Sequence, residues 1–385
     1  MKILKILILL LCLSLPLTVG AAGNAQTEEG EVSQEEVQEE WLAQFDFSEV
    51  DSMLKEIFPK EKLNFRDTLV KLITGDIDFS FTLVKQLITD QFSYEVRNSR
   101  AGMIHILLLV IIAAIFANFS SVFQSTQVSE ISFSMLYMLL LTICLNNFRL
   151  LVNSAEVNLE QMTGFMEVLG PVYFLAVAFA TGSSTSVTFY QFILLLIYLI
   201  EVFIQSFLVP LTQIYLIVRI LGELSPEVPL TKFGEFIETI VSWSLKTLLA
   251  GVVGLNVIQG LIHPAIDAVK RSLVTKGSQM IPIIGDAIGG TAEIVLGTAV
   301  LIKNGIGVAG MVICLIICIV PIVQMAVTTL LYQLIAALMQ PISDKRMVNC
   351  ISTMAEGTKM LLRIVFTTGM LFLLTIAVAA AMTGG

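Results

Sequence analysis

The sequence has little charge for its length. Of its 385 residues, 14% are charged and 56% are hydrophobic, whereas an average soluble domain has about 25% charged residues. Residues 169–200 and 304–343 contain no Asp, Glu, Lys or Arg. The mean hydropathy of +0.87 fits a chain surrounded mainly by hydrocarbon. The composition therefore excludes an ordinary soluble domain and predicts an all-α, polytopic integral membrane protein.

Histidine and cysteine are also scarce. His105 and His263 are the only histidines, so no zinc cluster or histidine-based triad can be assembled. None of the five cysteines lies in the polar stretch 23–100, which excludes a secreted disulfide framework. A nucleotide-binding glycine loop ending in Lys-Ser/Thr is missing as well. We therefore predict a non-enzymatic protein with no catalytic residues, no cofactor and no metal site.

The N-terminus has the pattern of an export signal. Lys2 and Lys5 precede an apolar stretch, 6–17, which is too short to span a membrane comfortably. Small residues follow at 20–23, as at a cleavage site. We predict a cleavable signal peptide at 1–22, which places residues 23–100 outside the cytoplasm.

The exported region 23–100 holds most of the negative charge. It contains 17 acidic and 8 basic residues, a balance that disfavours nucleic acid as a partner. Residues 26–40 have no apolar face and are predicted to be disordered. Beyond them, apolar residues recur at helical spacing, with breaks at Pro59 and Gly75. We expect short amphipathic helices that pack on a partner or on the protein's own membrane domain.

Residues 101–385 form the predicted transmembrane domain. A helix needs about 20 apolar residues to cross the hydrocarbon, and the runs in this region give about seven spans, some of them broken or amphipathic. The first two, 101–124 and 131–148, form an antiparallel hairpin. Residues 152–167 are expected to form an interfacial helix. The small polar residues at 181–185 predict a turn.

Two apolar runs are too long for one simple crossing. As a single helix, 187–221 would be about 52 Å long, against about 30 Å of hydrocarbon, and 304–340 poses the same problem. Each run contains a proline, Pro210 or Pro321, which kinks or ends a helix. The first run must bend, re-enter the membrane or protrude. The second fits either two short helices or one long kinked helix.

A few polar residues interrupt the apolar background and are functional hypotheses by default. Glu201 lies inside an apolar run, with Gln205 four residues later on the same helical face. They could line a polar path or a helix contact; alternatively, Glu201 is paired with a cation or buried in its protonated form. The glycine-rich segment 276–310 contains Asp286, Glu293 and Lys303. It predicts either a re-entrant, pore-lining element or an interfacial helix.

The same segment carries a family resemblance. The stretch IPIIGDAIGGTAEIVLG at 281–297, followed by 301–304, and the tail from 344 through Lys359 and Arg363 into the last apolar helix resemble the stage III sporulation protein AE family of endospore-forming bacteria. The resemblance covers the whole chain, from signal peptide to polytopic domain.

The resemblance implies a location and a set of partners. The protein would sit in the mother-cell membrane around the forespore. It would belong to a transenvelope channel or export complex with ring-forming sporulation membrane proteins and a cytoplasmic ATPase. In that complex Glu201, Gln205, Asp286, Glu293 and Lys303 are the candidate polar-path or assembly residues. The alternative is a stand-alone secondary transporter for a small solute, although no sequence repeat supports it.

Overall fold

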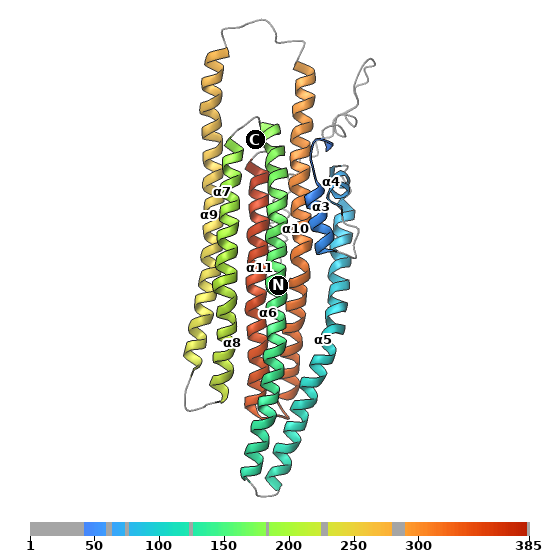
Figure 1. Cartoon of the computed structure of the whole chain (residues 1–385), viewed down its shortest axis with the longest axis vertical. Helices are drawn as coiled ribbons and strands as arrows, with labels where there is room; N and C mark the ends of the chain where they lie inside the picture. The colour runs from blue at the N-terminus through green and yellow to red at the C-terminus, as the bar shows by residue number, and fades with distance from the viewer. Residues whose placement is uncertain are drawn as a thin grey trace.

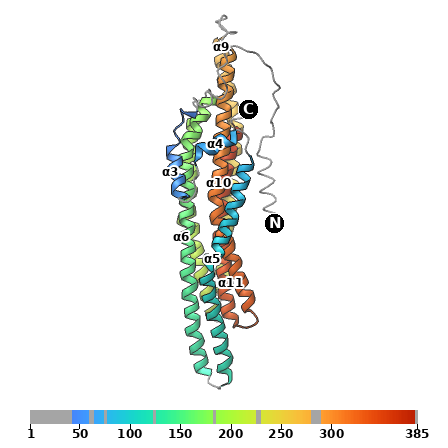
Figure 2. The same cartoon turned by 90° about the vertical axis from the view of Figure 1, so that its right-hand side faces the viewer.

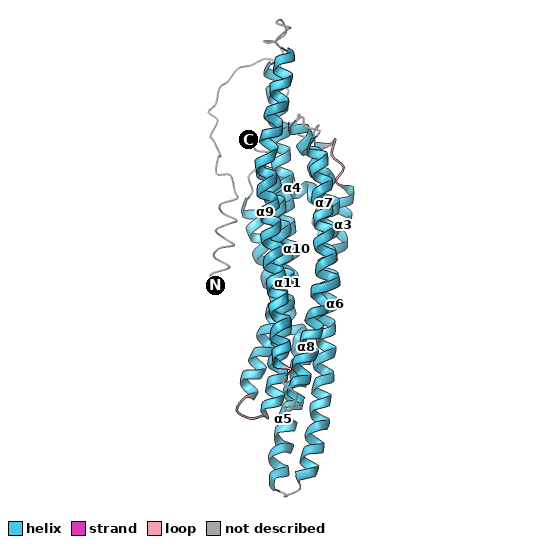
Figure 3. Ribbon diagram, turned by 90° about the vertical axis from the view of Figure 1, so that its left-hand side faces the viewer, coloured by secondary structure: helices cyan, strands magenta, loops and turns pink. Residues whose placement is uncertain are grey.

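Every regular element in the described residues is helical (Figure 3). The computed structural model describes residues 42–58, 64–73, 77–122, 126–181, 185–224, 230–278 and 289–382. Its elements are α3 (Ser48–Ile57), α4 (Phe65–Ile73), α5 (Ile77–Val122), α6 (Thr126–Thr181), α7 (Thr185–Phe203), the π-helix η1 (Ile204–Leu208), α8 (Val209–Leu224), α9 (Thr231–Ser278), α10 (Gly289–Met339) and α11 (Lys345–Met382). The prediction of an all-α fold is confirmed.

The long helices lie side by side in an elongated bundle (Figure 1). α10 packs most extensively on α11 and also on α5 and α6, while α8 and α9 pack on α11 from another side. α6 has 56 residues and α10 has 51, which corresponds to about 84 and 77 Å of helix. Both are more than twice the hydrocarbon thickness of about 30 Å. A single bilayer therefore covers only part of the bundle.

Residues 152–167 do not form a separate interfacial helix, so that prediction was wrong. They continue α6, which runs without a break from Thr126 to Thr181 and contains Pro171. The reason is that the buried apolar stripe is uninterrupted across this stretch, with a buried residue every three or four positions. The stripe consists of Phe148, Leu151, Val152, Ala155, Leu159, Met162, Phe165, Met166 and Leu169.

The two prolines in overlong runs are accommodated differently. Before Pro210 the chain forms the π-helix Ile204–Leu208, whose wider turn suits a residue that lacks an N–H and crowds the preceding carbonyl. The run around Pro321 is one continuous helix, α10, rather than two short ones. The turn predicted at 181–185 falls where α6 ends at Thr181 and α7 begins at Thr185.

The short helices α3 and α4, which belong to the region predicted to be exported, pack on the protein's own bundle. α3 lies against α6, and α4 lies against α10 (Figure 2). Glycines allow the close approach: a Cβ atom at Gly164 of α6 would lie 2.6 Å from Met53 Cε, and one at Gly305 of α10 would lie 2.9 Å from Leu69 Cδ1. Val50, Leu54, Phe65 and Leu69 are fully buried at these contacts. We expected these helices to pack either on a partner or on the protein's own membrane domain. In the structure they pack on α6 and α10 of this chain.

Five helices in the described residues are long and apolar enough to cross a membrane. Their candidate spans are Ile131–Ala180, Leu195–Gly222, Thr231–Leu255, Gly297–Met339 and Lys345–Ala377. α5 is continuous across position 100, where the exported and transmembrane regions were expected to meet. The predicted signal peptide at 1–22 and the acidic stretch 26–40 lie outside the described residues.

Candidate functional site

Glu201 and Gln205 lie together beside the π-helix. Gln205 Nε2 donates a hydrogen bond to Glu201 Oε1 at 3.2 Å, as their spacing of four residues predicts. The Glu201 carboxylate also feels the charges of Glu167 and Glu160 on α6. The sequence pattern thus identified the Glu201–Gln205 pair, and it did not identify the two α6 carboxylates whose charges act on it.

Lys303 is fully buried on α10. It lies two helical turns before Gly310 and on the same helical face, and Gly310 approaches Leu169 of α6, where a Cβ atom would lie 2.6 Å from Leu169 Cδ2. A charge buried to this extent is costly and needs compensation from its surroundings. Lys303 therefore lies on the face of α10 that meets α6 at Gly310.

The polar residues predicted from the sequence do not meet at one place. Leu169 is two residues after Glu167, which corresponds to about 200° around α6. Glu201 and Lys303 therefore approach α6 from opposite sides. Glu293 lies within the first turns of α10, and Asp286 lies outside the described residues.

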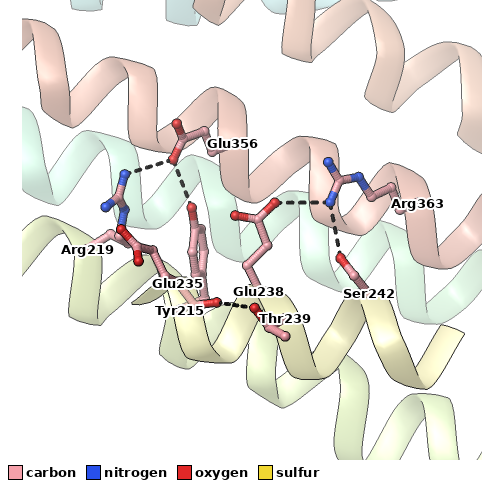
Figure 4. A network of polar contacts seen from close by, with 8 residues as sticks. All are labelled: Tyr215, Arg219, Glu235, Glu238, Thr239, Ser242, Glu356 and Arg363. Atoms are coloured by element: carbon pink, nitrogen blue, oxygen red, sulfur yellow. Dashed lines mark hydrogen bonds and ion pairs between the residues drawn. The ribbon is translucent and has the colours of Figure 1, made fainter. Parts of the chain in front are cut away.

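The best-defined polar contacts join α8, α9 and α11 (Figure 4). We call the residues that make them the α8–α9–α11 seam: Tyr215, Arg219, Glu238, Ser242, Glu356 and Arg363. In its first half, the Glu356 carboxylate of α11 accepts two bonds through Oε2. Tyr215 Oη donates at 2.8 Å, and Arg219 Nη2 lies at 3.3 Å. Tyr215 is buried, whereas Arg219 and Glu356 remain partly exposed. One carboxylate thus ties α11 to two residues on the same face of α8.

The second half of the seam ties α11 to α9. Arg363 Nη1 donates to Glu238 Oε1 at 3.1 Å and to Ser242 Oγ at 3.4 Å. Arg363 and Glu238 are both about 40% exposed, so water screens the pair and its net stabilisation is about 0–1 kcal/mol. The seam therefore fixes the register of three helices more than it adds to stability.

A second polar network lies between α5, α6 and α10. The buried Glu95 of α5 accepts hydrogen bonds from Ser99 Oγ at 3.0 Å and Thr328 Oγ1 at 3.5 Å. Burial raises the pKa of the Glu95 carboxyl above its ordinary value, and the two hydroxyl donors oppose this in part. One turn from Thr328 on α10, Gln324 accepts from Ser154 Oγ of α6 at 2.9 Å. We call these residues the Glu95 network.

Neither the α8–α9–α11 seam nor the Glu95 network was predicted from the sequence, although the spacing of some seam residues indicates that they share a helical face. Tyr215 and Arg219 are spaced i, i+4 within an apolar run, and Glu356 and Arg363 are spaced i, i+7 on one face of α11. Such spacings show that two polar residues share a face, but not which helix they face. Within the described residues, no three His, Cys, Asp or Glu side chains are grouped to hold a metal ion.

Comparison with known proteins gives a consistent result over nearly the whole chain. The family model described as stage III sporulation protein AE matches residues 63–383. The stage III sporulation protein AE of Bacillus subtilis (strain 168) is 24% identical over 369 residues, covering 94% of this chain and 92% of that protein. No solved structure matches the chain. The family is not known as enzymatic. With more than half of its length matched by the family model, the chain belongs to the stage III sporulation protein AE family.

Proposed function

We propose that this protein is a non-enzymatic, multi-pass component of a sporulation channel or export complex. It acts in the mother-cell membrane that surrounds the forespore and is required for forespore development. Its exported N-terminal region faces the space between the two membranes. Its partners are ring-forming sporulation membrane proteins and a cytoplasmic ATPase.

The observation that carries this proposal is the family match over residues 63–383. The structure adds two features that suit a structural membrane component. Five helices are apolar and long enough to cross a membrane, and the exported helices α3 and α4 are packed on the bundle rather than held on a separate domain. Both features favour a rigid platform on which other subunits assemble.

The decisive experiment is purification of the tagged, full-length chain from sporulating cells. We expect the ring-forming membrane proteins and the cytoplasmic ATPase to co-purify with it in stoichiometric amounts. If the chain instead purifies alone and catalyses uptake of a small solute into vesicles, it is a stand-alone transporter and the proposal is wrong.

The candidate polar residues are tested in the same cells. Glu201→Leu removes the hydrogen bond with Gln205 and a carboxylate that interacts electrostatically with Glu167 and Glu160 of α6. Asp286→Leu removes one of the acidic residues in the glycine-rich segment. We expect each variant to accumulate normally but to reduce spore yield at least tenfold. Ser206→Leu, an exposed neighbour on the same π-helix, is the control and should be neutral. If both acidic variants sporulate normally, these residues are not part of a polar path.

A further inference from the structure

The two polar networks lie at the same level of the bundle. Gly357 of α11 shows which residues of α8 and α6 lie at its level. A Cβ atom at Gly357 would lie 2.9 Å from Leu216 Cδ1 of α8 and 3.0 Å from Phe148 Cε2 of α6. Twelve residues further along α11, Gly369 lies near Met162 of α6. Residue numbers therefore increase in the same direction along both helices.

This register brings the seam and the Glu95 network into one layer. Six residues beyond the Gly357–Phe148 contact lie Arg363 on α11 and Ser154 on α6, each about 9 Å further along its helix. Arg363 belongs to the seam, and Ser154 and Gln324 belong to the Glu95 network. We call this layer the polar belt; it includes polar side chains from α5, α6, α9, α10 and α11.

The outer surface of the polar belt carries aromatic and cationic side chains. Tyr94 on α5 is 54% exposed and Trp243 on α9 is 70% exposed, and each is adjacent to a belt residue, Glu95 or Ser242. The exposed cations in the belt or within about two helical turns of it include Arg97, Arg100, Arg149, Lys246 and Lys359. The same levels also carry exposed carboxylates, at Asp90, Glu160, Glu235 and Glu356. Exposed tyrosine, tryptophan, arginine and lysine at one level are typical of the lipid headgroup region.

Apolar sequence leaves the belt in both directions. On α5 the stretch 101–122 contains no Asp, Glu, Lys or Arg, and it runs away from the belt toward the α5–α6 connection. On α11 the stretch 364–382 is equally free of them and runs in the opposite direction. Each of these stretches is long enough to cross about 30 Å of hydrocarbon or nearly so. On α5 and on α11 the belt therefore marks the end of a stretch without Asp, Glu, Lys or Arg.

We propose that the polar belt binds the phosphate and glycerol headgroups of the bilayer, so that it fixes how deep the bundle sits in the membrane. The basic side chains at the belt pair with headgroup phosphates, and Tyr94 and Trp243 occupy the boundary between headgroups and acyl chains. The proposal depends on the membrane location of the chain and not on its place in a sporulation complex.

The test uses the fluorescence of single tryptophans in the full-length chain, reconstituted into vesicles of phosphatidylcholine and phosphatidylglycerol. The chain has two tryptophans, Trp41 and Trp243. In Trp41→Phe the remaining Trp243 reports the α9 side of the belt, and Tyr94→Trp in a background lacking both native tryptophans reports the α5 side. Leu195→Trp and Leu334→Trp, made in that background, are control probes in the two apolar zones, at positions that are exposed on the bundle.

Quenching by lipids with a nitroxide near the headgroup or deep in the acyl chain gives the depth of each probe. We expect both belt probes to be quenched at least twofold more by the shallow nitroxide, and at least one control probe to be quenched more by the deep one. The proposal is wrong if either belt probe is quenched best by the deep nitroxide. It is equally wrong if a belt probe responds only to a quencher dissolved in water.

Discussion

At the residue scale, Glu356 illustrates how one carboxylate joins two helices, α11 and α8. Its Oε2 atom accepts from the buried Tyr215 hydroxyl at 2.8 Å and from Arg219 at 3.3 Å. The exposed ion pair is worth about 0–1 kcal/mol. The bond from Tyr215 matters more, because a buried hydroxyl left without an acceptor costs about 1–3 kcal/mol.

Glu356→Ala should therefore lower the free energy of unfolding by about 1–3 kcal/mol. In a Tyr215→Phe background there is no buried hydroxyl that could lose its acceptor. Glu356→Ala should then lower the free energy of unfolding by less than about 1 kcal/mol. Thermal unfolding of the four proteins in detergent micelles measures the coupling between the two residues. Equal effects of Glu356→Ala in both backgrounds would show that the hydroxyl does not depend on this carboxylate.

Glu95 makes a prediction about pH. Burial raises the pKa of its carboxyl in the folded protein, so the protonated form is favoured by folding. The stability this provides is complete below the ordinary pKa of glutamate and is lost as pH rises through the raised value. Glu95→Gln keeps an acceptor for Ser99 and cannot ionise. The melting temperature of the variant relative to the natural protein should therefore increase between pH 4 and pH 7.5. A difference that is constant with pH would contradict the raised pKa.

At the element scale, two glycines let α3 and α4 lie close to the bundle. The α4–α10 contact depends on Gly305, where a Cβ atom would lie 2.8 Å from Ile73 Cγ1 and 2.9 Å from Leu69 Cδ1. Since both neighbours are side chains of α4, a larger residue at this position acts on the docking of α4 and leaves the transmembrane contacts of α10 in place.

Gly305→Leu should loosen α4, because overpacking of this kind costs about 1–3 kcal/mol. The undocked population of α4 should then rise about fivefold or more. Trypsin cleavage after Arg66 or Lys71, both on α4, should speed up by a similar factor. Gly251→Leu on α9 is the matched control, since nothing lies within 4 Å of a Cβ atom there. Unchanged cleavage in Gly305→Leu would show that α4 does not depend on this glycine.

Much of the element structure was predictable, and the failures have specific causes. Hydropathy and turn residues located the long helices and the break between α6 and α7 at 181–185. They did not predict that 152–167 continues α6. The amphipathic pattern of a segment is the same whether its apolar side contacts lipid or other helices. The hydrogen-bond partners of Arg363 and Glu356 could not be predicted for a similar reason. The spacing of residues in one sequence shows which side of a helix they share, but packing determines which other helix that side contacts.

At the scale of the whole molecule, the length of the helices constrains the placement in the membrane. From Gly305, where α4 docks, α10 continues for 34 residues to Met339, which is about 51 Å. A hydrocarbon layer of about 30 Å fits within that distance. The helices α3 and α4 and the α10–α11 connection can therefore lie on opposite sides of one bilayer. The signal peptide predicted at 1–22 would place α3 and α4 outside, and Lys345 and Arg346 at the start of α11 favour a cytoplasmic connection by the positive-inside rule. The same rule alone would also place Arg97 and Arg100 inside, and we follow the signal peptide for the N-terminal side.

Labelling of single cysteines with a membrane-impermeant maleimide tests this arrangement most directly. Ser48→Cys places a thiol on exposed α3 and Gln340→Cys places one at the exposed end of α10. The four described native cysteines are buried, so the unmodified chain is the control. We predict that Ser48→Cys reacts in intact bacterial cells, whereas Gln340→Cys reacts only after the membrane is permeabilised. Labelling of Gln340→Cys in intact cells, or protection of Ser48→Cys, would contradict a bundle that crosses the membrane with its N-terminal helices outside.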